Sequence, residues 1–454
     1  MAAPPQRSRP RRALLTIAVV TGLLPAATAC GGVHFAAGKQ PFTTMGYGLG
    51  DALATVRLHE AQKALGDTKI QVNEGAFDEQ QFLSAVAADD APDVVHMDRA
   101  LIGGYAARGA IVPLTDCLQR KGVDLDDFRD SAMSQSTLDG TVYSLPDSYD
   151  NRTLLINGDV LKAAGHSLSD VDTSDWKSLK KLAKDLHATK NGKVTRIGFD
   201  PKIPEFFPLW VHANGGRLIS KDGRTALLDT PKVIEALRYT VSLINAQGGW
   251  GKVKSRRDSF DMFGKGNPMV KDQIGVFPME DWYLSVLGDV SPQINLDTRI
   301  FKDRKGDPLN FVSGYGWAIP KGSPHPKKAC TFITTITSAG TWVKAAKAKA
   351  ADIRKDGSPY IGDFTGNKVA DRRIRRQVWK PTGNQAFDDA SHQLYAAQEG
   401  AFSVPANPGG TEFRKAWQDA VNRVLSGETT PEEALKSAQK KAQSILDLAN
   451  QGRE

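Results

Sequence analysis

Segments with the character of β-strands alternate with helix-like segments along most of this chain, and this alternation limits its fold more than any other feature. The stretches that predict strands are KIQVNEG (69–75), PDVVHMD (92–98) and TLLING (153–158). The stretches that predict helices follow them in turn, as DEQQFLSAVAADD (78–90), ALIGGYAARG (100–109) and DVLKAAG (159–165). Strands and helices in succession are typical of a sheet covered by helices, so we expect an α/β fold.

Two further helices are predicted by their side-chain pattern. The stretch TSDWKSLKKLAKDLHA (173–188) places an apolar stripe on one helical face. The residues of that stripe are Trp176, Leu179, Leu182 and Leu186. In TTPEEALKSAQKKAQSILDLA (429–449), Thr430 and Glu433 have the spacing of a capping box, and Pro431 suits the first turn.

The N-terminus predicts export from the cytoplasm. Residues 1–12 contain four arginines and no acid, and the apolar run 13–25 is shorter than the roughly twenty residues of a membrane span. A basic region, a short apolar run and small residues before a cleavage point are typical of a signal peptide. LPAATACGG (24–32) resembles the cleavage box of bacterial lipoproteins, so we expect residues 1–29 to be removed and Cys30 to be lipidated.

The alternative for this N-terminus is an ordinary secretory peptide, cut at an A-x-A site, in which Cys30 has no role. The pair Arg11-Arg12 is compatible with either the general or the twin-arginine export route. After Cys30 we expect residues 30–40 to form a tether. The body would then lie at the extracellular face of the cell membrane, anchored by lipid.

Length and charge narrow the class of protein. The 425 residues that follow the predicted signal are enough for two or three domains. The net charge of +8 includes four signal-peptide arginines, so the mature chain is only mildly basic and nucleic acid is not an expected partner. The two remaining cysteines, Cys117 and Cys330, either form a disulfide in an oxidising compartment or are small core residues.

Several signatures of enzymes are absent from the sequence. It contains no G-x-x-x-x-G-K phosphate loop, no G-x-S-x-G nucleophile elbow and no H-E-x-x-H zinc motif. Glycoside hydrolysis would need two carboxylates across a cleft, and Asp147, Asp150 or the pair Glu280-Asp281 could supply them. We therefore keep a lipid-anchored glycoside hydrolase as the alternative to a binding protein.

Longer stretches of the chain, from about Gly66 to Ala449, resemble the extracellular solute-binding proteins of ABC importers. The resemblance is to the family 1 sugar-binding branch, which includes maltose-binding protein. It is weaker between Phe35 and Leu65. The stretches that carry it are QFLSAVAADDAPDVVHMD, YAARGAIVPL, YSLPDSYDNRTLLINGDVLKAAG, SDWKSLKKLAKDL, HANGGRLI, GVFPMEDW, SGYGWAIPKGSPHPKKACTFI and VLSGETTPEEAL.

The resemblance implies a two-lobed, periplasmic-binding-protein-like fold, with the ligand in a cleft between the lobes and several chain crossings at a hinge. Lobe 1 would comprise residues 41–146 and about 300–345. Lobe 2 would comprise residues 150–295 and about 346–454. The first crossing would be SLPDSYDNR (144–152), where Pro146 suits a hinge.

A sugar offers hydroxyl groups and an apolar ring face, so its site needs aromatic surfaces and polar side chains. The aromatic candidates, in or beside segments that face the cleft in the family, are Tyr149, Trp210, Trp282, Tyr315 and Trp317. For the three tryptophans, packing in the core is the alternative. The polar candidates are Asp98, Arg99, Asp150, Glu280 and Asp281, with helix or turn capping as the alternative for Asp98 and Asp150. Three other tryptophans lie in helix-like stretches and are expected in the core, namely Trp176, Trp342 and Trp417.

The resemblance also implies the partners. We expect a monomeric receptor, not an enzyme, that needs no cofactor or metal and delivers a sugar to membrane permease subunits driven by a separate ATPase. A third hypothesis keeps the fold but assigns a sensor or a receptor for an anionic solute. That solute would be captured by Arg372, Arg373, Arg375 or Arg376 in the basic run 368–380, which is otherwise a solvated helix face.

Overall fold

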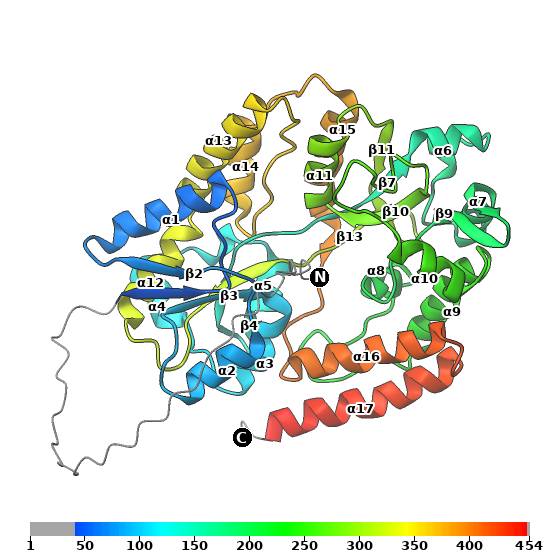
Figure 1. The fold of residues 1–454 in the computed structure, drawn as a ribbon. Helices are drawn as coiled ribbons and strands as arrows, with labels where there is room; N and C mark the ends of the chain where they lie inside the picture. Colours follow the sequence, from blue (N-terminus) through cyan, green and yellow to red (C-terminus); the bar gives the residue numbers. More distant parts are fainter. Residues whose placement is uncertain (1–40, 452–454) are drawn as a thin grey trace, which may run out of the picture. The chain divides into compact units, whose positions relative to one another are not determined.

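The computed structural model describes residues 41–451. The signal peptide, the lipidated Cys30 and the tether predicted for residues 1–40 lie outside the described residues. Within residues 41–451, no helix is both long enough and apolar enough to cross a membrane. Two five-stranded sheets, each covered by helices, organise this part of the chain (Figure 1).

The first sheet has the strand order β2-β1-β3-β14-β6. Its strands are β1 (Phe42–Met45), β2 (Ile70–Asn73), β3 (Val94–Asp98), β6 (Ser144–Pro146) and β14 (Tyr315–Ala318). Strand β1 is parallel to β2 and β3, whereas β14 is antiparallel to β3 and β6. Successive residues of β3 enter different apolar cores, Val94 on one side and Val95 on the other. The sheet is therefore buried on both faces, which explains why PDVVHMD is a continuous apolar run.

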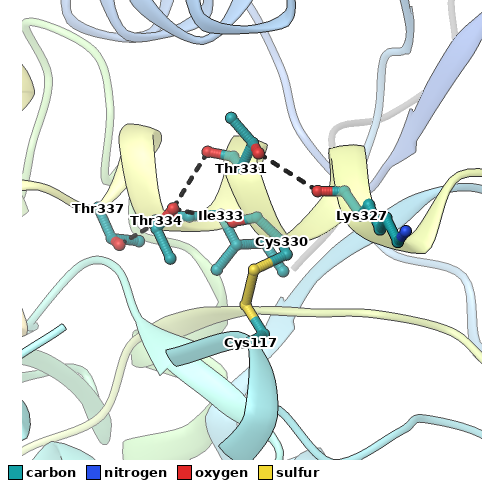
Figure 2. Close-up of a disulfide and its surroundings, with 7 residues drawn as sticks. All are labelled: Cys117, Lys327, Cys330, Thr331, Ile333, Thr334 and Thr337. Carbon is teal, nitrogen blue, oxygen red and sulfur yellow. Dashed lines mark hydrogen bonds between the residues drawn. A yellow bond between two sulfur atoms is a disulfide. The ribbon is translucent and has the colours of Figure 1, made fainter. Parts of the chain in front are cut away.

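Helices α1 (Ala52–Leu65), α4 (Thr115–Lys121) and α12 (Pro326–Ile336) pack with this sheet on the side of Phe42 and Trp317. The other helices of this part of the fold are α2 (Glu79–Ala87), α3 (Ile102–Ala107) and α5 (Asp130–Ser136). The disulfide partners lie on α4 and α12, where Cys117 and Cys330 are joined across 213 residues of sequence (Figure 2). Of the two alternatives that the sequence left open for these cysteines, the structure has the disulfide.

The second sheet has the order β11-β7-β10-β9-β8. Its strands are β7 (Arg152–Asn157), β8 (Ala188–Lys190), β9 (Lys193–Phe199), β10 (Ile274–Glu280) and β11 (Leu296–Arg299). Strand β7 is antiparallel to β10 and β11, and β10 is parallel to β9. The surrounding helices are α6 (Gly158–Ala163), α7 (Trp176–Leu186), α8 (Phe207–Ala213), α9 (Pro231–Asn245), α10 (Trp250–Asp258), α11 (Trp282–Val290), α15 (Gln385–Ala397), α16 (Gly410–Leu425) and α17 (Pro431–Gln451).

Helices α7 and α17 confirm the two detailed helix predictions. Asp175 caps α7 by accepting from the backbone N–H groups of Lys177 and Ser178, and the predicted stripe is buried. At α17, the Thr430 hydroxyl accepts from the Glu433 N–H at 3.3 Å, and a Glu433 carboxylate oxygen lies 3.5 Å from the Thr430 N–H. The local sequence therefore determines where both helices begin.

Two small sheets complete the fold. One has the order β12-β13-β15, made of Phe301–Lys302, Pro308–Phe311 and Ala401–Phe402. The other pairs β4 (Thr137–Leu138) with β5 (Thr141–Val142). The chain passes between the two large sheets at residues 147–151, at residues 300–314 and in the C-terminal third of the sequence.

The C-terminal third differs from the predicted division into lobes. Helix α13 (Ala339–Lys355) packs on α1, and α14 (Lys368–Gln377) packs on α13, so both helices lie with the first sheet (Figure 1). The prediction placed residues from about 346 in the second lobe. These helices go with the first sheet because their buried apolar residues, including Trp342 and Ile374, form a core with Leu53 of α1.

Candidate ligand-binding site

A cavity of about 460 Å³ lies among segments that belong to both sheet systems. Its volume falls in the range of small-molecule sites. It is bordered by the start of α1, the first crossing, the start of α11, helix α13 and the segment 361–364. The lining residues are Asp51, Ala52, Leu53, Ser148, Tyr149, Asp150, Asp281, Trp282, Ser285, Asp289, Trp342, Lys349, Asp352, Ile353, Asp356, Ile361, Gly362, Asp363 and Phe364.

The first crossing is held between two other chain segments, and this fixes the wall of the cavity that it forms. The N–H of Tyr149 donates to the Phe364 carbonyl at 3.1 Å. The N–H of Asp150 donates to the Ser313 carbonyl, also at 3.1 Å. The three segments therefore meet at the predicted crossing SLPDSYDNR.

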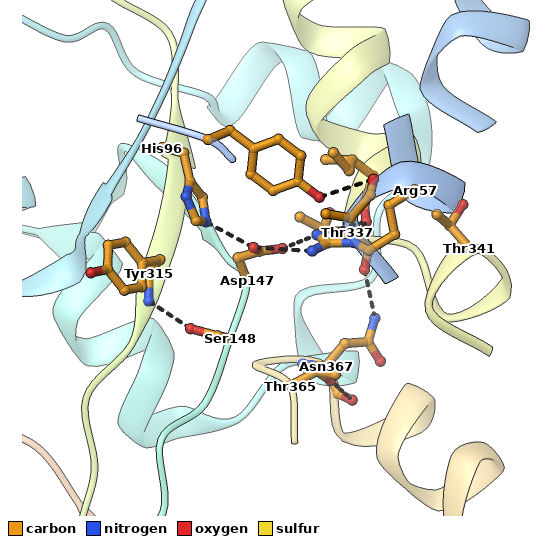
Figure 3. Close-up of polar contacts among 12 residues, drawn as sticks. Arg57, His96, Asp147, Ser148, Tyr315, Thr337, Thr341, Thr365 and Asn367 are labelled. Carbon is orange, nitrogen blue, oxygen red and sulfur yellow. Dashed lines mark hydrogen bonds and ion pairs between the residues drawn. The ribbon is translucent and has the colours of Figure 1, made fainter. Parts of the chain in front are cut away.

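A buried network fixes Asp147 at the start of this crossing (Figure 3). Arg57 of α1 forms an ion pair with the Asp147 carboxylate and also donates from Nε to the Ile336 carbonyl at 3.2 Å. His96 of β3 contacts Asp147 through Nε2 at 2.8 Å. Burial by itself raises the pKa of Asp147, but the charge of Arg57 and the hydrogen bond with His96 outweigh it and lower this pKa to about 2. The carboxylate is therefore ionised and tied to α1 and β3, and Arg57 links the same network to α12.

His96 also supports Tyr315, one of the predicted aromatic candidates. The two rings are stacked, with centroids 4.9 Å apart and an interplanar angle of 19°. Tyr315 is 43% exposed, so one part of its ring is open to a ligand. It does not border the 460 Å³ cavity, but its backbone is joined to the first crossing, because the Tyr315 N–H donates to the Ser148 hydroxyl at 3.0 Å.

Two carboxylates of the cavity, those of Asp150 and Asp281, are held by amide and hydroxyl groups. One oxygen of Asp281, Oδ2, accepts from the N–H of Asn151 at 3.2 Å and from its side-chain amide at 3.1 Å. Asp150 accepts from the Ser313 hydroxyl at 3.3 Å. Burial, and then the charge of Asp150, raises the pKa of Asp281 well above its usual range. Burial also raises the pKa of Asp150 against the lowering effect of Arg152.

Glu280 lies next to this pair in sequence but has a different environment. It accepts from Arg152 at 3.0 Å, and Arg152 also donates to the Phe311 carbonyl and to the Ser313 hydroxyl. The guanidinium of Arg152 also lies over the rings of Phe206 and Phe311, 4.6 and 4.5 Å from their centroids. Glu280 is therefore half of an ion pair beside the crossing and does not line the cavity.

Among the predicted aromatic residues, Tyr149 and Trp282 border the cavity. Trp282 begins α11 and is 41% exposed, with its ring stacked on Phe263 at a centroid distance of 6.0 Å. Tyr149 is buried, and its hydroxyl is 2.6 Å from that of Ser131. Trp282 is thus the aromatic side chain with the most surface to offer to a sugar ring.

Trp210 and Trp317 do not lie as predicted. Both are fully buried and neither lines the cavity. Trp210 packs in the core of the second sheet system, and its indole N–H donates to the Pro201 carbonyl at 2.8 Å. Trp317 packs against Phe332 in the core of the first sheet. Their ring faces are covered by protein and are not available for stacking on a ligand.

Asp98 and Arg99 lie at the end of β3, as expected, but outside the cavity lining. Arg99 is fully buried and donates to the carbonyls of Tyr315 and Ser313 at 2.8 and 2.6 Å, so it holds backbone together and cannot reach a ligand. Asp98 caps the turn that follows β3 and pairs with Arg414 of α16 at 3.1 Å. This pair joins β3 to a helix that also packs on α17.

Sequence reasoning missed several residues of the cavity, among them Asp51, Trp342, Lys349 and Asp363. Asp51 is the N-cap of α1, in the stretch where the family resemblance is weak. Trp342 was expected in the core, and it is indeed 2% exposed, yet it is also among the residues that border the cavity. The packing of α13 on α1 brings Asp51, Trp342 and Lys349 together, and Asp363 reaches the site through its ion pair with Lys349.

The basic run 368–380 forms α14 and the residues after it. None of its four arginines is among the residues that line the cavity. Arg375 lies over the ring of Tyr395, and Arg372, Arg373 and Arg376 are exposed. This arrangement agrees with a solvated helix face. Among residues 41–451, no group of three or more His, Cys, Asp or Glu side chains is placed to hold a metal ion.

Residues 57–351, well over half of the chain, match the family described as bacterial extracellular solute-binding protein. The chain belongs to this family. Its similarity extends to an arabinooligosaccharide-binding protein of Bacillus subtilis (strain 168), which is 21% identical over 302 residues, or 63% of this chain. The matched region spans 66% of that relative, just under two thirds of its length.

Solved structures of the same fold cover most of the chain. CpMnBP1 with mannotriose bound aligns with a TM-score of 0.71 and 24% identity, over 89% of this chain and 100% of that one. Lmo0181 from Listeria monocytogenes, in complex with cycloalternan, aligns with a TM-score of 0.70 and 18% identity, over 90% of this chain and 99% of that one. The predicted family and the predicted α/β binding-protein fold are confirmed, and these relatives are solute-binding proteins rather than enzymes.

Proposed function

We propose that this protein is an extracellular receptor that binds a sugar or an oligosaccharide. The observation that carries the proposal is the 460 Å³ cavity at the chain crossings, where Trp282 offers a half-exposed indole beside the carboxylates of Asp150 and Asp281. An indole face suits the apolar face of a sugar ring, and carboxylates accept hydrogen bonds from its hydroxyls. The relatives named for oligosaccharide binding support the same choice of ligand class.

Binding at this place also explains how the receptor would respond to its ligand. The cavity is bordered by α1 and α13, which pack with the first sheet, and by α11, which packs on the second sheet. A ligand that touches both sides favours the conformation in which they are close, because those contacts exist only there. The two sheet systems correspond to the lobes in this proposal, with the crossings as the hinge.

The remaining parts of the proposal concern the membrane. Lipidation of Cys30 would hold the receptor at the outer face of the cell membrane, and the closed receptor would deliver its ligand to permease subunits driven by a separate ATPase. Mass spectrometry of the mature N-terminus tests the anchor. A diacylated Cys30, and release of a Cys30→Ser variant into the medium, are the expected results. An unmodified residue 30 in the mature chain contradicts it.

Calorimetric titration with arabino-, manno- and malto-oligosaccharides tests the binding function. We expect one series to bind without turnover, and Trp282→Ala to weaken that binding at least tenfold, since it removes about 1.4 kcal/mol or more of stacking and apolar contact. Trp379→Ala is the matched control, because Trp379 is a half-buried indole outside the cavity. Equal affinities for the wild type and for Trp282→Ala would contradict the proposed site.

A further inference from the structure

The lining of the cavity is strongly acidic, although the chain as a whole carries a net charge of +8. It contains one lysine, Lys349, and no arginine or histidine. Its carboxylates are Asp51, Asp150, Asp281, Asp289, Asp352, Asp356 and Asp363. A site for a neutral sugar needs only a few hydrogen-bond acceptors, so the seven carboxylates of this lining exceed what such a ligand requires.

Few protein cations neutralise these carboxylates. Lys349 pairs with Asp363 at 2.7 Å, and Lys355 pairs with Asp352 at 2.9 Å on the exposed side of α13. The other carboxylates of the lining form no ion pair within the described part of the chain. The charges of Arg152 and Arg99 oppose the rise that burial causes in the pKa of Asp150, but neither guanidinium forms an ion pair with its carboxylate, and Arg152 pairs with Glu280 instead.

Asp281 is the most informative of these carboxylates because it is deeply buried. The residue is 6% exposed, its Oδ2 accepts both bonds from Asn151, and its Oδ1 accepts no hydrogen bond from residues 41–451. A buried carboxylate without a cation or a full set of donors is costly to keep ionised, and such groups in proteins are nearly always paired. The free oxygen belongs to a side chain that lines the cavity, so a ligand can supply the missing donor.

An exposed aromatic ring, that of Trp282, borders the same space. Trp342 and Tyr149 also border it, but both are buried, and Arg57 and Arg129 already lie over their rings. The negative face of an aromatic ring attracts cations, so the Trp282 indole beside these carboxylates suits an ammonium group as well as a sugar ring. This observation is independent of the charge count, and it points to the same kind of ligand.

We propose that the solute bound in this cavity carries a protonated amine, and that it is an amino sugar or a short amino-sugar oligosaccharide. This inference rests on the proposed function and narrows its ligand class. The ammonium group would complete the coordination of Asp281, Trp282 would cover the sugar ring, and the remaining aspartates would accept from hydroxyls. The raised pKa of Asp281, caused first by burial, is the behaviour expected of a carboxyl that lacks its cation in the unliganded protein.

Calorimetry with matched ligands tests this. The panel contains glucose, glucosamine and N-acetylglucosamine, the corresponding β-1,4-linked disaccharides, and spermidine as an amine without a sugar. The amine form of a sugar is expected to bind at least tenfold more tightly than its acetylated and hydroxyl forms, and to lose part of that advantage in high salt. Asp281→Asn and, separately, Asp150→Asn are expected to remove most of the advantage. Asp419→Asn, a change of the same kind on exposed α16, is expected to leave it intact.

The outcomes separate the inference from the function on which it rests. Tight binding of neutral sugars with no gain from the amine overturns the inference and leaves the proposed function standing. Binding of spermidine without any sugar supports a cation site and overturns the sugar receptor. An amine advantage that persists in both aspartate variants, each shown by its thermal midpoint to be folded, overturns the assignment to this cavity.

Discussion

Replacing Arg57 by methionine should lower the free energy of unfolding by about 3 to 5 kcal/mol, because it leaves the buried Asp147 carboxylate without its cation. Arg57 and Asp147 are each 2% exposed, and the same guanidinium also donates to the Ile336 carbonyl. Methionine keeps much of the apolar stem that packs beside Trp342, over which the guanidinium carbon lies 3.7 Å from the ring centroid. The loss therefore reports mainly on charge and hydrogen bonding.

Chemical denaturation of a double-mutant cycle measures this contribution. Arg57→Met and Asp147→Asn are each expected to be strongly destabilising, and the two together to cost about 2 kcal/mol less than their sum, since the second change removes the charge that the first left unpaired. Arg423→Met is the control, because its ion pair with Glu428 is half exposed and should contribute under about 1 kcal/mol. A loss of that same small size in Arg57→Met would refute the reasoning.

Acid titration gives a second check on the same pair. The pKa of Asp147 is lowered to about 2 in the folded protein, from 3.8 without these interactions. A carboxyl with a lowered folded pKa stabilises the protein above its unfolded pKa, and that stabilisation disappears as the pH falls through the folded pKa. The wild type should therefore lose about 2 kcal/mol between pH 4 and pH 2 that Asp147→Asn does not lose.

Three further predictions concern the cores and the site. Replacing Cys117 and Cys330 by serine should cost about 5 kcal/mol of unfolding free energy, since the bond closes a loop of more than 200 residues; denaturation with and without reductant measures it, and a loss below 1 kcal/mol contradicts it. Trp210→Ala should cost about 3 to 5 kcal/mol while the folded fraction still binds ligand, whereas Trp282→Ala should weaken binding with little change in the thermal midpoint; the reverse pattern contradicts the placement of these residues. Burial lowers the pKa of His212 to about 4, so on acidification the unfolded chain binds a proton at this residue before the folded protein does. The free energy of unfolding should therefore fall by about 3 kcal/mol from pH 6.5 to pH 4 in the wild type but not in His212→Phe, and urea denaturation at each pH measures it.

Individual strands and helices could be predicted from the sequence because the apolar pattern and capping residues that determine them lie within the same short stretch. KIQVNEG contains β2, PDVVHMD contains β3 and TLLING overlaps β7. The order of strands could not be predicted in the same way. Strand β14, at residues 315–318, lies between β3 and β6, and this position depends on pairing across more than 160 residues.

The site could be predicted only where a chain crossing marks it. Asp150 follows closely on Pro146, and both lie where the chain leaves the first sheet, at the crossing that the family resemblance implied. Trp210 and Trp282 look alike in sequence, but α8 turns Trp210 into the core while Trp282 begins its helix at the cavity. Asp51 was missed because it serves as an ordinary helix cap, and only tertiary packing brings it to the cavity.

The disulfide between α4 and α12 has a consequence for experiments that cut the chain. All five strands of the second sheet lie between Cys117 and Cys330 in sequence. A protease that makes one nick there produces two pieces that remain a single covalent molecule until a thiol is added. The nicked protein keeps its intact mass, apart from one added water, and its fragments stay at a high effective concentration for reassembly. Digestion patterns therefore have to be read on reduced samples.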